Sequence, residues 1–257
     1  MKIEEQIQEL LKKFEEEKNV EILLAVESGS RMWGFASPDS DYDIRVIYKH
    51  PKEKYLSVGE PKDNYEHVGA LIDYQSWDLK KALRLAAKSN VAVFEWMDSG
   101  IVYKENPEFR EALVKIRDKY FSAQLAKSAY WGMATGNYRE YLRSDMVRMK
   151  KYFYVLRPLL ACDHIQVTGK MPPVLFSELV DLYFPKLLRP YLDDLLEKKM
   201  KHPELKEIPR IDKINDFLER KLDEHHSAVS YKKLKQEPLE EKDLSLVDEV
   251  FQQFISK

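Results

Sequence analysis

Residues 27–48 read Glu-Ser-Gly-Ser-Arg-Met-Trp-Gly-Phe-Ala-Ser-Pro-Asp-Ser-Asp-Tyr-Asp-Ile-Arg-Val-Ile-Tyr. This stretch places a Gly-Ser turn at Gly29 and Ser30 and, after ten further residues, two carboxylates at Asp41 and Asp43. Glycine lets the backbone approach a ligand closely, and a serine in the following helical turn adds a hydroxyl beside free N–H donors. The order of these groups indicates a site that holds a triphosphate and its metal ions.

The two carboxylates have the spacing of a strand. Residues 41–48 are rich in β-branched and aromatic side chains, and the apolar run 20–26 predicts a buried strand before them. Side chains two residues apart on a strand share a face, so Asp41 and Asp43 should point the same way. Residues 37–40 have the composition of a turn between the two strands. Hard cations such as Mg²⁺ prefer oxygen ligands from a few carboxylates and substrate phosphates.

Gly29-Ser30, the ten intervening residues and Asp41-Tyr42-Asp43 together resemble the motif of the DNA polymerase β-type nucleotidyltransferase superfamily. The longer wording, Glu-Ser-Gly-Ser-Arg-x-Trp-Gly-Phe followed by Ser-Asp-Tyr-Asp-x-Arg, is similar more narrowly to the RlaP/YcgL-like family of predicted nucleotidyltransferases. The resemblance covers roughly the first two thirds of the chain. It implies an enzyme that transfers a nucleoside monophosphate from a nucleoside triphosphate and releases pyrophosphate.

That superfamily uses a third carboxylate on a later strand, and Asp73 is the predicted counterpart. It stands in Ala-Leu-Ile-Asp-Tyr, where apolar neighbours make an unpaired carboxylate costly unless a cation accompanies it. Asp63 and Glu66 fall in a polar stretch that predicts a loop or an exposed strand start. Asp78 is expected in the first turn of the next helix, where a carboxylate interacts favourably with the helix dipole.

The resemblance also implies a division of roles among these residues. Asp41, Asp43 and Asp73 would be the catalytic residues and the ligands of two ions, Mg²⁺ or Mn²⁺. Asp41 and Asp43 would hold both ions, while Asp73 would bind the second and help to deprotonate an acceptor hydroxyl. Ser30 and the backbone around Gly29 would hold the β and γ phosphates. The implied partner is a nucleoside triphosphate, with ATP, and therefore AMP transfer, favoured.

A second group of candidate residues lies farther along the chain. Lys150, Tyr154 and Arg157 have i, i+4, i+7 spacing, which places them on one helical face. They resemble the helix after the catalytic domain of many nucleotidyltransferases, where basic groups reach the triphosphate and an aromatic ring supports the nucleotide. Residues 127–157 contain seven basic and two acidic side chains, a local net charge of plus five in a chain whose total is −2. Whether Lys150 or Lys151 faces the triphosphate stays open, with a solvated lysine face as the alternative.

Three arginines have open or directed roles. Arg31 could contact phosphate, and Arg45 shares a strand face with the two carboxylates, so each is expected either to contact nucleotide or to serve as scaffold. Pro158 should disturb its helix and direct Arg157 inward. Other side chains of the family wording are interpreted as packing rather than chemistry: Glu27, Trp33 and Phe35.

Composition limits the class of protein. With 257 residues and 44% hydrophobic content, the chain can bury a core and should form two packed units. The single cysteine, Cys162, excludes an internal disulfide and gives no support for a zinc site. His225 and His226 are expected on a solvated helix surface. No apolar run approaches the roughly 20 residues of a membrane span, and no signal-peptide pattern is present, so no membrane partner and a cytoplasmic location are expected.

Local patterns sketch the organisation. Residues 1–18 predict an amphipathic helix, and residues 76–88 predict another. Asn106 and Pro107 have the pattern of an N-cap followed by proline at the first helical position, opening a helix toward Tyr120. Beyond that point the pattern is almost entirely helical. Breaks are predicted at two places, 169–173 and 201–209.

The predicted fold class is α+β, with a nucleotidyltransferase-type mixed β-sheet and flanking helices followed by a helical C-terminal domain. Residues 1–120 would form the nucleotidyltransferase catalytic domain. Residues 121–257 would form the helical domain that completes the nucleotide cleft.

The sequence does not identify the acceptor. Basic and aromatic residues between 130 and 157 favour an RNA end, since cationic grooves with stacking rings suit single strands. The family name carries an association with RNA repair, which is analogy. Because the net charge is −2 and the pI is near 6.4, a protein or small-molecule acceptor stays open. A protein acceptor would fit a toxin–antitoxin pair. A non-catalytic nucleotide-binding module is a further alternative, against which the intact Gly29, Ser30, Asp41 and Asp43 argue.

Overall fold

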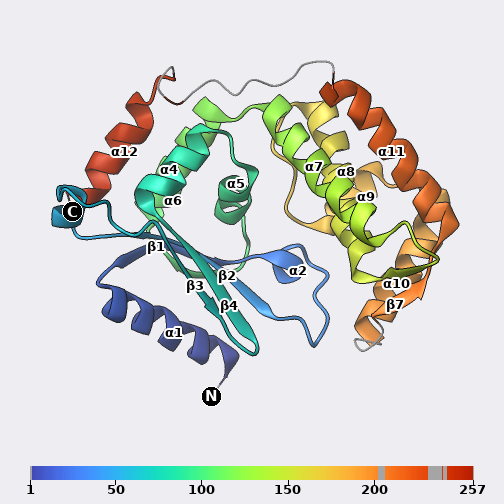
Figure 1. The fold of residues 1–257 in the computed structure, drawn as a ribbon, viewed down its shortest axis with the longest axis horizontal. Helices are drawn as coiled ribbons and strands as arrows, with labels where there is room; N and C mark the ends of the chain where they lie inside the picture. Colours follow the sequence, from blue (N-terminus) through green and yellow to red (C-terminus); the bar gives the residue numbers. More distant parts are fainter. Residues whose placement is uncertain (1, 202–205, 231–238, 240–241, 257) are drawn as a thin grey trace. The chain divides into compact units, whose positions relative to one another are not determined.

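The structure is a computed structural model, drawn as a ribbon in Figure 1. Contacts between residues divide the chain into two groups, here called unit 1 and unit 2. Unit 1 carries a five-stranded sheet, and unit 2 is mainly helical. The residues that the structure describes are 2–201, 206–230, 239 and 242–256.

The sheet of unit 1 has the strand order β3-β4-β2-β1-β5. Strands β2 and β4 pair in parallel, whereas the other neighbours pair antiparallel, so the sheet is mixed. This arrangement confirms the predicted α+β class. The strands are β1 Glu21–Glu27, β2 Tyr42–Lys49, β3 Asn64–Val68, β4 Ile72–Asp78 and β5 Val102–Glu105.

Helices cover both faces of this sheet (Figure 1). Ile7, Leu11 and Phe14 of α1 are buried in one core cluster with strand residues of β1, β2 and β4, as the predicted apolar face requires. Helices α4, α5 and α6 cover the other face, where Trp77 of β4 lies against Trp96 of α5 with ring centroids 4.0 Å apart. The helices of unit 1 are α1 Ile3–Lys18, α2 Gly29–Met32, α3 Lys52–Tyr55, α4 Leu79–Ala87, α5 Val91–Met97, α6 Pro107–Tyr120 and α12 Ser245–Ile255.

Unit 2 is built around α8, which packs against α7, α9 and α11. The prediction of an almost entirely helical region is correct apart from a short two-stranded ribbon, β6-β7. The predicted break at 169–173 lies between α8 and α9, and the part of the other break at 202–205 falls outside the described residues. The elements of unit 2 are α7 Ala123–Tyr141, β6 Met146–Arg148, α8 Lys150–Thr168, α9 Phe176–Tyr183, η1 Lys186–Leu188, α10 Arg189–Lys201, β7 Glu207–Pro209 and α11 Asp212–Ser230.

Two helix starts show where local patterns succeed and fail. Asn106 caps α6 through its side chain, which accepts a hydrogen bond from Phe109 N, and Pro107 is the first helical residue, as predicted. The helix predicted over 76–88 begins later, because β4 continues to Asp78 in parallel pairing with β2. Asp78 is the N-cap of α4, where its carboxylate accepts from Lys80 N, rather than a residue of the first turn.

The two units do not follow the predicted division at residue 120 throughout. Residues 33–40, between the Gly-Ser turn and Asp41, group with unit 2. Helix α12 groups with unit 1. The ring centroids of Phe254 and Phe109 lie 5.2 Å apart, and Lys49 Nζ donates to Phe254 O. The ranges are 1–32, 41–121 and 236–257 for unit 1, and 33–40 and 122–235 for unit 2.

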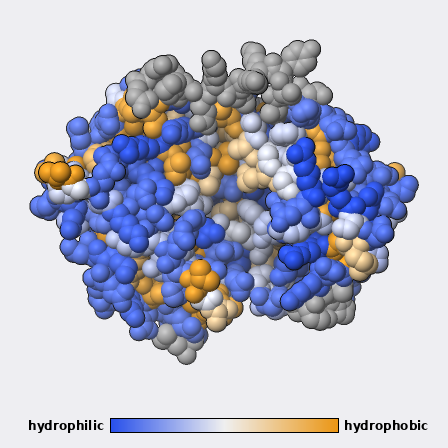
Figure 2. All heavy atoms as spheres, in the orientation of Figure 1, coloured by the Kyte–Doolittle hydropathy of each residue, from blue (hydrophilic) through white to orange (hydrophobic). Residues whose placement is uncertain are grey.

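The surface is largely polar. In Figure 2 hydrophilic residues cover most of the visible face, and apolar side chains appear in separate groups. Among the helices in the described part of the chain, none combines the length and apolar character that a membrane span requires.

Candidate active site

The parallel pair β2-β4 brings two predicted catalytic acids together. Asp43 is the register partner of Asp73, and both are half-buried. Asp41 immediately precedes β2 and is exposed. Because the sheet register joins segments 30 residues apart, the prediction that Asp73 lies on a strand beside Asp43 is confirmed in its geometry, while its catalytic role stays a prediction.

Gly29 lies directly against the Asp43 carboxylate. Its φ of +62° is in the left-handed region, and a Cβ at this position would stand 2.5 Å from Asp43 Oδ2. The following residue, Ser30, is in α2, and Ser28 N donates to Asp43 O at 2.8 Å. The Gly-Ser turn and the Asp-x-Asp strand are therefore packed together, and the glycine is required both by its backbone conformation and by this contact.

Gly29→Ala should destabilise the fold by roughly 1–2 kcal/mol for the left-handed conformation alone, with an added cost from displacing Asp43. A matched control is Gly132→Ala in the middle of α7, where a Cβ would meet nothing within 4 Å. That control should stabilise by roughly 0.5–1 kcal/mol, because alanine favours a helix interior over glycine. Urea unfolding of both variants measures the contrast, and equal effects would contradict the close packing.

Glu27 is a buried side chain that fixes the contact between the Gly-Ser turn and β2. The sequence pattern did not predict this role. Glu27 is fully buried at the end of β1, and its Oε1 accepts from Asp43 N at 2.8 Å. Its Oε2 accepts from the Tyr103 hydroxyl on β5. Burial raises the pKa of Glu27, although the hydrogen bonds from Tyr103 and Asp43 oppose that rise. Glu27 therefore fixes the backbone of Asp43 rather than merely packing.

The carboxylates influence one another electrostatically. Burial raises the pKa of Asp43, Arg45 opposes this, and the negative charges of Asp73 and Asp41 raise it further. Asp43 Oδ1 lies 3.6 Å from Arg45, and Asp73 Oδ1 accepts from Gly69 N at 2.9 Å. Among the residues that the structure describes, no three His, Cys, Asp or Glu side chains gather closely enough to hold a metal ion.

The donor set nevertheless fits a hard divalent cation in its chemistry. Three carboxylates supply the oxygen ligands that Mg²⁺ and Mn²⁺ prefer. A cation would also remove the repulsion by which Asp41 and Asp73 raise the pKa of Asp43. The competing partners are Arg45 for Asp43 and the Gly69 N–H for Asp73.

The two arginines near the site both have protein partners. The Arg31 guanidinium lies 3.7 Å from the Tyr42 ring centroid, and its Nε donates to Asp41 O at 3.2 Å. Arg45 contacts Asp43 and donates to Ile44 O. These contacts place both arginines against the backbone or the charge of β2, and whether either also contacts nucleotide stays a prediction.

The candidates on α8 lie in unit 2 and differ in exposure. Lys150 is exposed, whereas Lys151 is half-buried, 4.1 Å from the Tyr141 ring centroid and 5.1 Å from that of Tyr154. Arg157 is 3% exposed, stacks on Trp33 at 4.5 Å and points toward Val174 O, in line with the predicted inward direction. Lys150 is thus the more accessible of the two lysines, and contact of any of these residues with nucleotide stays a prediction.

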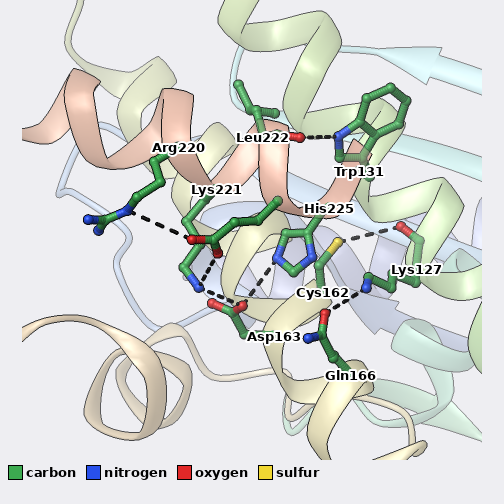
Figure 3. Close-up of polar contacts among 10 residues, drawn as sticks. Lys127, Trp131, Cys162, Asp163, Gln166, Arg220, Lys221, Leu222 and His225 are labelled. Atoms are coloured by element: carbon green, nitrogen blue, oxygen red, sulfur yellow. Dashed lines mark hydrogen bonds and ion pairs between the residues drawn. The ribbon is translucent and has the colours of Figure 1, made fainter. Parts of the chain in front are cut away.

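His225 corrects the expectation of a solvated histidine pair. Figure 3 shows His225 of α11 and Asp163 of α8 pointing toward one another, with Lys221 on the same carboxylate. His225 is 1% exposed, whereas His226 is exposed and stacks on Trp131. Burial raises the pKa of Asp163, but its contacts with His225 and Lys221 together lower it. This polar cluster joins α11 to α8 inside unit 2.

Comparisons with known proteins bear on this site. A family model described as "RlaP: RNA repair pathway DNA polymerase beta family" matches residues 3–253. The chain belongs to this RlaP family. The RlaP assignment confirms the resemblance predicted from Gly29-Ser30 and Asp41-Tyr42-Asp43, and it extends over nearly the whole chain.

Two further proteins are similar to this RlaP-family chain. The uncharacterized protein YcgL of Bacillus subtilis (strain 168) is 42% identical over 229 residues, which are 88% of this chain and 87% of that protein. A crystal structure of a nucleotidyltransferase-like protein from Exiguobacterium sibiricum 255-15 covers 97% of this chain and 89% of its own, with 13% identity and a TM-score of 0.34.

Proposed function

We propose that this RlaP-family protein is a metal-dependent nucleotidyltransferase that moves a nucleoside monophosphate, with AMP favoured, from a nucleoside triphosphate to an acceptor hydroxyl. The observation that carries the proposal is the junction of Gly29 with Asp43, which stands in register with Asp73. The buried Glu27 fixes this junction at the Asp43 backbone. Gly29, the carboxylates of Asp43 and Asp73, and the buried Glu27 thus lie together at this part of the sheet.

Asp41, Asp43 and Asp73 would hold the cations, two ions of Mg²⁺ or Mn²⁺. When bound, such ions stabilise the attacking and leaving oxygens of an in-line displacement and neutralise the phosphates. Asp73, half-buried beside Asp43, would accept a proton from the acceptor hydroxyl. The Gly29 backbone and the Ser30 hydroxyl would orient the β and γ phosphates of the leaving pyrophosphate.

For the nucleotide, Lys150 and Tyr154 are the proposed contacts from α8. Lys150 is exposed and Tyr154 is half-buried. Arg157, being buried against Trp33, would act by holding that part of the helix in place. Arg31 would contribute positive charge next to Asp41 while it stacks on Tyr42.

An RNA end is the proposed acceptor, supported by the pathway named in the family description. Unit 2 also presents cations over aromatic rings, with Arg148 and Lys151 both over Tyr141. Rings and cations of this kind suit the bases and phosphates of a single strand.

Incubation with α-³²P-labelled nucleoside triphosphates, Mg²⁺ or Mn²⁺, and fractionated cell extract tests the proposal. Label should enter the RNA fraction, require the metal, and disappear with Asp41→Asn/Asp43→Asn. Label in a polypeptide or in small molecules would replace the RNA acceptor while keeping the transferase. If the protein binds nucleotide but labels no fraction of the extract and no purified RNA end, the transferase is overturned in favour of a binding module.

A further inference from the structure

Side chains of β2, β3 and β4 divide between the two faces of the sheet in unit 1. Alternate residues, among them Ile44, Tyr74 and Tyr65, pack with α1 in one apolar cluster. The residues between them face away from α1, because successive side chains of a strand point to opposite faces. Asp43 and Asp73, which are register partners, lie on this second face.

The same register places a second row of polar residues beside the acids. Arg45 is the register partner of Gln75, and Gln75 is the partner of Glu66 on β3. This row stands two residues along the strands from the row that contains Asp43 and Asp73, about 6.5 Å away by the rise of a strand. The face opposite α1 thus carries a row of acids and, next to it, a row of one cation, one amide and one carboxylate.

Two members of the second row are available to a ligand. Arg45 is already engaged, since it lies 3.6 Å from Asp43 Oδ1 and donates to Ile44 O. Glu66 is exposed, and Gln75 is half-buried. Within the part of the chain that the structure describes, neither of these two side chains has a hydrogen-bond or ion-pair partner. A half-buried amide in this position is a group that a bound ligand would satisfy.

The chemistry of the two side chains indicates which group they bind. A carboxylate only accepts hydrogen bonds, whereas an amide NH₂ donates them. A hydroxyl donates one hydrogen bond and accepts others, so it satisfies Glu66 and Gln75 at the same time. A phosphate is disfavoured, because Glu66 and the acids on the same face repel it. The 2′-hydroxyl of a ribose, which deoxyribose lacks, is such a group next to a 3′-hydroxyl.

The strand order indicates which substrate carries that ribose. Gly29, the proposed phosphate contact, lies against Asp43 and follows β1, which flanks β2 on the side away from β4. Glu66 and Gln75 lie on the other side of β2, on β3 and β4. Asp73, also on β4, is the residue proposed to take the proton of the acceptor hydroxyl. The pair Glu66 and Gln75 therefore lies on the acceptor side of the site.

We propose that Glu66 and Gln75 form a subsite for the terminal ribose of the acceptor and bind the 2′-hydroxyl beside the 3′-hydroxyl that reacts. The inference rests on the proposed function, because it names the chemistry of the acceptor at that same site. It makes the protein selective for an acceptor that ends in an unphosphorylated ribose over one that ends in a deoxyribose.

Two oligoribonucleotides test this, identical except that one ends in a ribonucleotide and the other in a 2′-deoxynucleotide, both with a 3′-hydroxyl. The unaltered protein should label the first with a kcat/KM roughly 10–100-fold higher, because the second leaves a charged group without its hydrogen bond. Glu66→Met and Gln75→Met should each bring this ratio close to one. Glu60→Met, at an exposed glutamate before β3, is the matched control and should keep the full ratio.

Binding gives a second readout that does not require turnover. Fluorescence anisotropy of the two oligonucleotides, labelled at the 5′ end, should show the same preference in Kd for the unaltered protein and for Glu60→Met. The preference should be lost in Glu66→Met and Gln75→Met. Circular dichroism identifies folded variants, and a merely structural role would affect both oligonucleotides alike, leaving their ratio unchanged.

Three results would overturn the inference and leave the transferase in place. One is an unchanged ratio in folded Glu66→Met and Gln75→Met, including an equal loss of rate with both oligonucleotides. Another is a changed preference between ATP and 2′-deoxy-ATP as donors, which would assign the pair to the donor ribose. The third is label that enters a polypeptide but neither oligonucleotide. If the proposed function fails instead, the unaltered protein transfers no label at all, and the anisotropy ratio still decides whether the pair binds a ribose.

Discussion

Replacing Asp43 by asparagine should abolish nucleotidyl transfer and raise the stability of the fold. Activity should fall by more than about 100-fold, because even changes around metal ligands cost about 10–100-fold. Stability should rise because the pKa of Asp43 is raised in the folded state, first by burial and then by Asp73 and Asp41 against the opposing Arg45. A raised pKa means that folding disfavours the charged carboxylate, and asparagine carries no charge.

The sign of the pH dependence follows from the same shift. Below the ordinary carboxyl pKa of 3.8, Asp43 is protonated in both the folded and the unfolded chain. Its titration therefore should not change the stability of the original protein relative to Asp43→Asn in this range. As the pH rises through the raised folded pKa, the original protein should lose stability relative to Asp43→Asn. Thermal midpoints measured from acid to neutral pH give this difference.

Asp118→Asn on the exposed side of α6 is the matched control and should change neither activity nor midpoint. Unaltered transfer by Asp43→Asn would remove this residue from the active site. A lower midpoint at neutral pH would show that its pairing with Arg45 outweighs burial and repulsion.

Glu27→Ala should destabilise unit 1 more than any other single change considered at the site. It leaves the Asp43 N–H and the Tyr103 hydroxyl without their buried acceptor. Each of the two unsatisfied groups costs about 1–3 kcal/mol, so the free energy of unfolding should fall by roughly 2–6 kcal/mol. Urea unfolding measures it, and transfer activity should fall as well because Asp43 loses its anchor.

Glu27→Gln separates the hydrogen bonds from the charge. Its amide oxygen can accept from Asp43 N while its NH₂ donates to the Tyr103 oxygen. The glutamine variant should therefore retain most of the stability. If glutamine proved as damaging as alanine, the negative charge rather than the hydrogen-bond geometry would be what the junction needs.

The sequence was a sound guide wherever a pattern is local. The apolar face of α1 and the cap at Asn106 follow from neighbouring residues, and the structure has both. The strand position of Asp73 is likewise indicated by its own apolar flanks. Its partnership with Asp43, however, depends on parallel pairing of β2 and β4, which becomes visible only in the register.

Long-range contacts account for what the sequence could not predict. The sequence indicates only a packing role for Glu27, because its hydrogen-bond partner Tyr103 lies 76 residues away on β5. The sequence indicates a surface position for His225, because the carboxylate that stabilises it when buried, Asp163, lies on another helix. Residues 76–78 fit a helical period by themselves, but pairing with β2 keeps them in the strand.

Unit 1 draws its residues from three separate stretches of chain and unit 2 from two. Such interleaving bears on how a protein of this kind can change over generations. A recombination event that exchanged everything after residue 121 would also replace Lys199, which donates to Phe35 O within residues 33–40. It would likewise replace α12, whose Phe254 packs against Phe109. Exchange of one unit as a module would therefore disturb packing in both, so we expect new specificity to arise by point substitution.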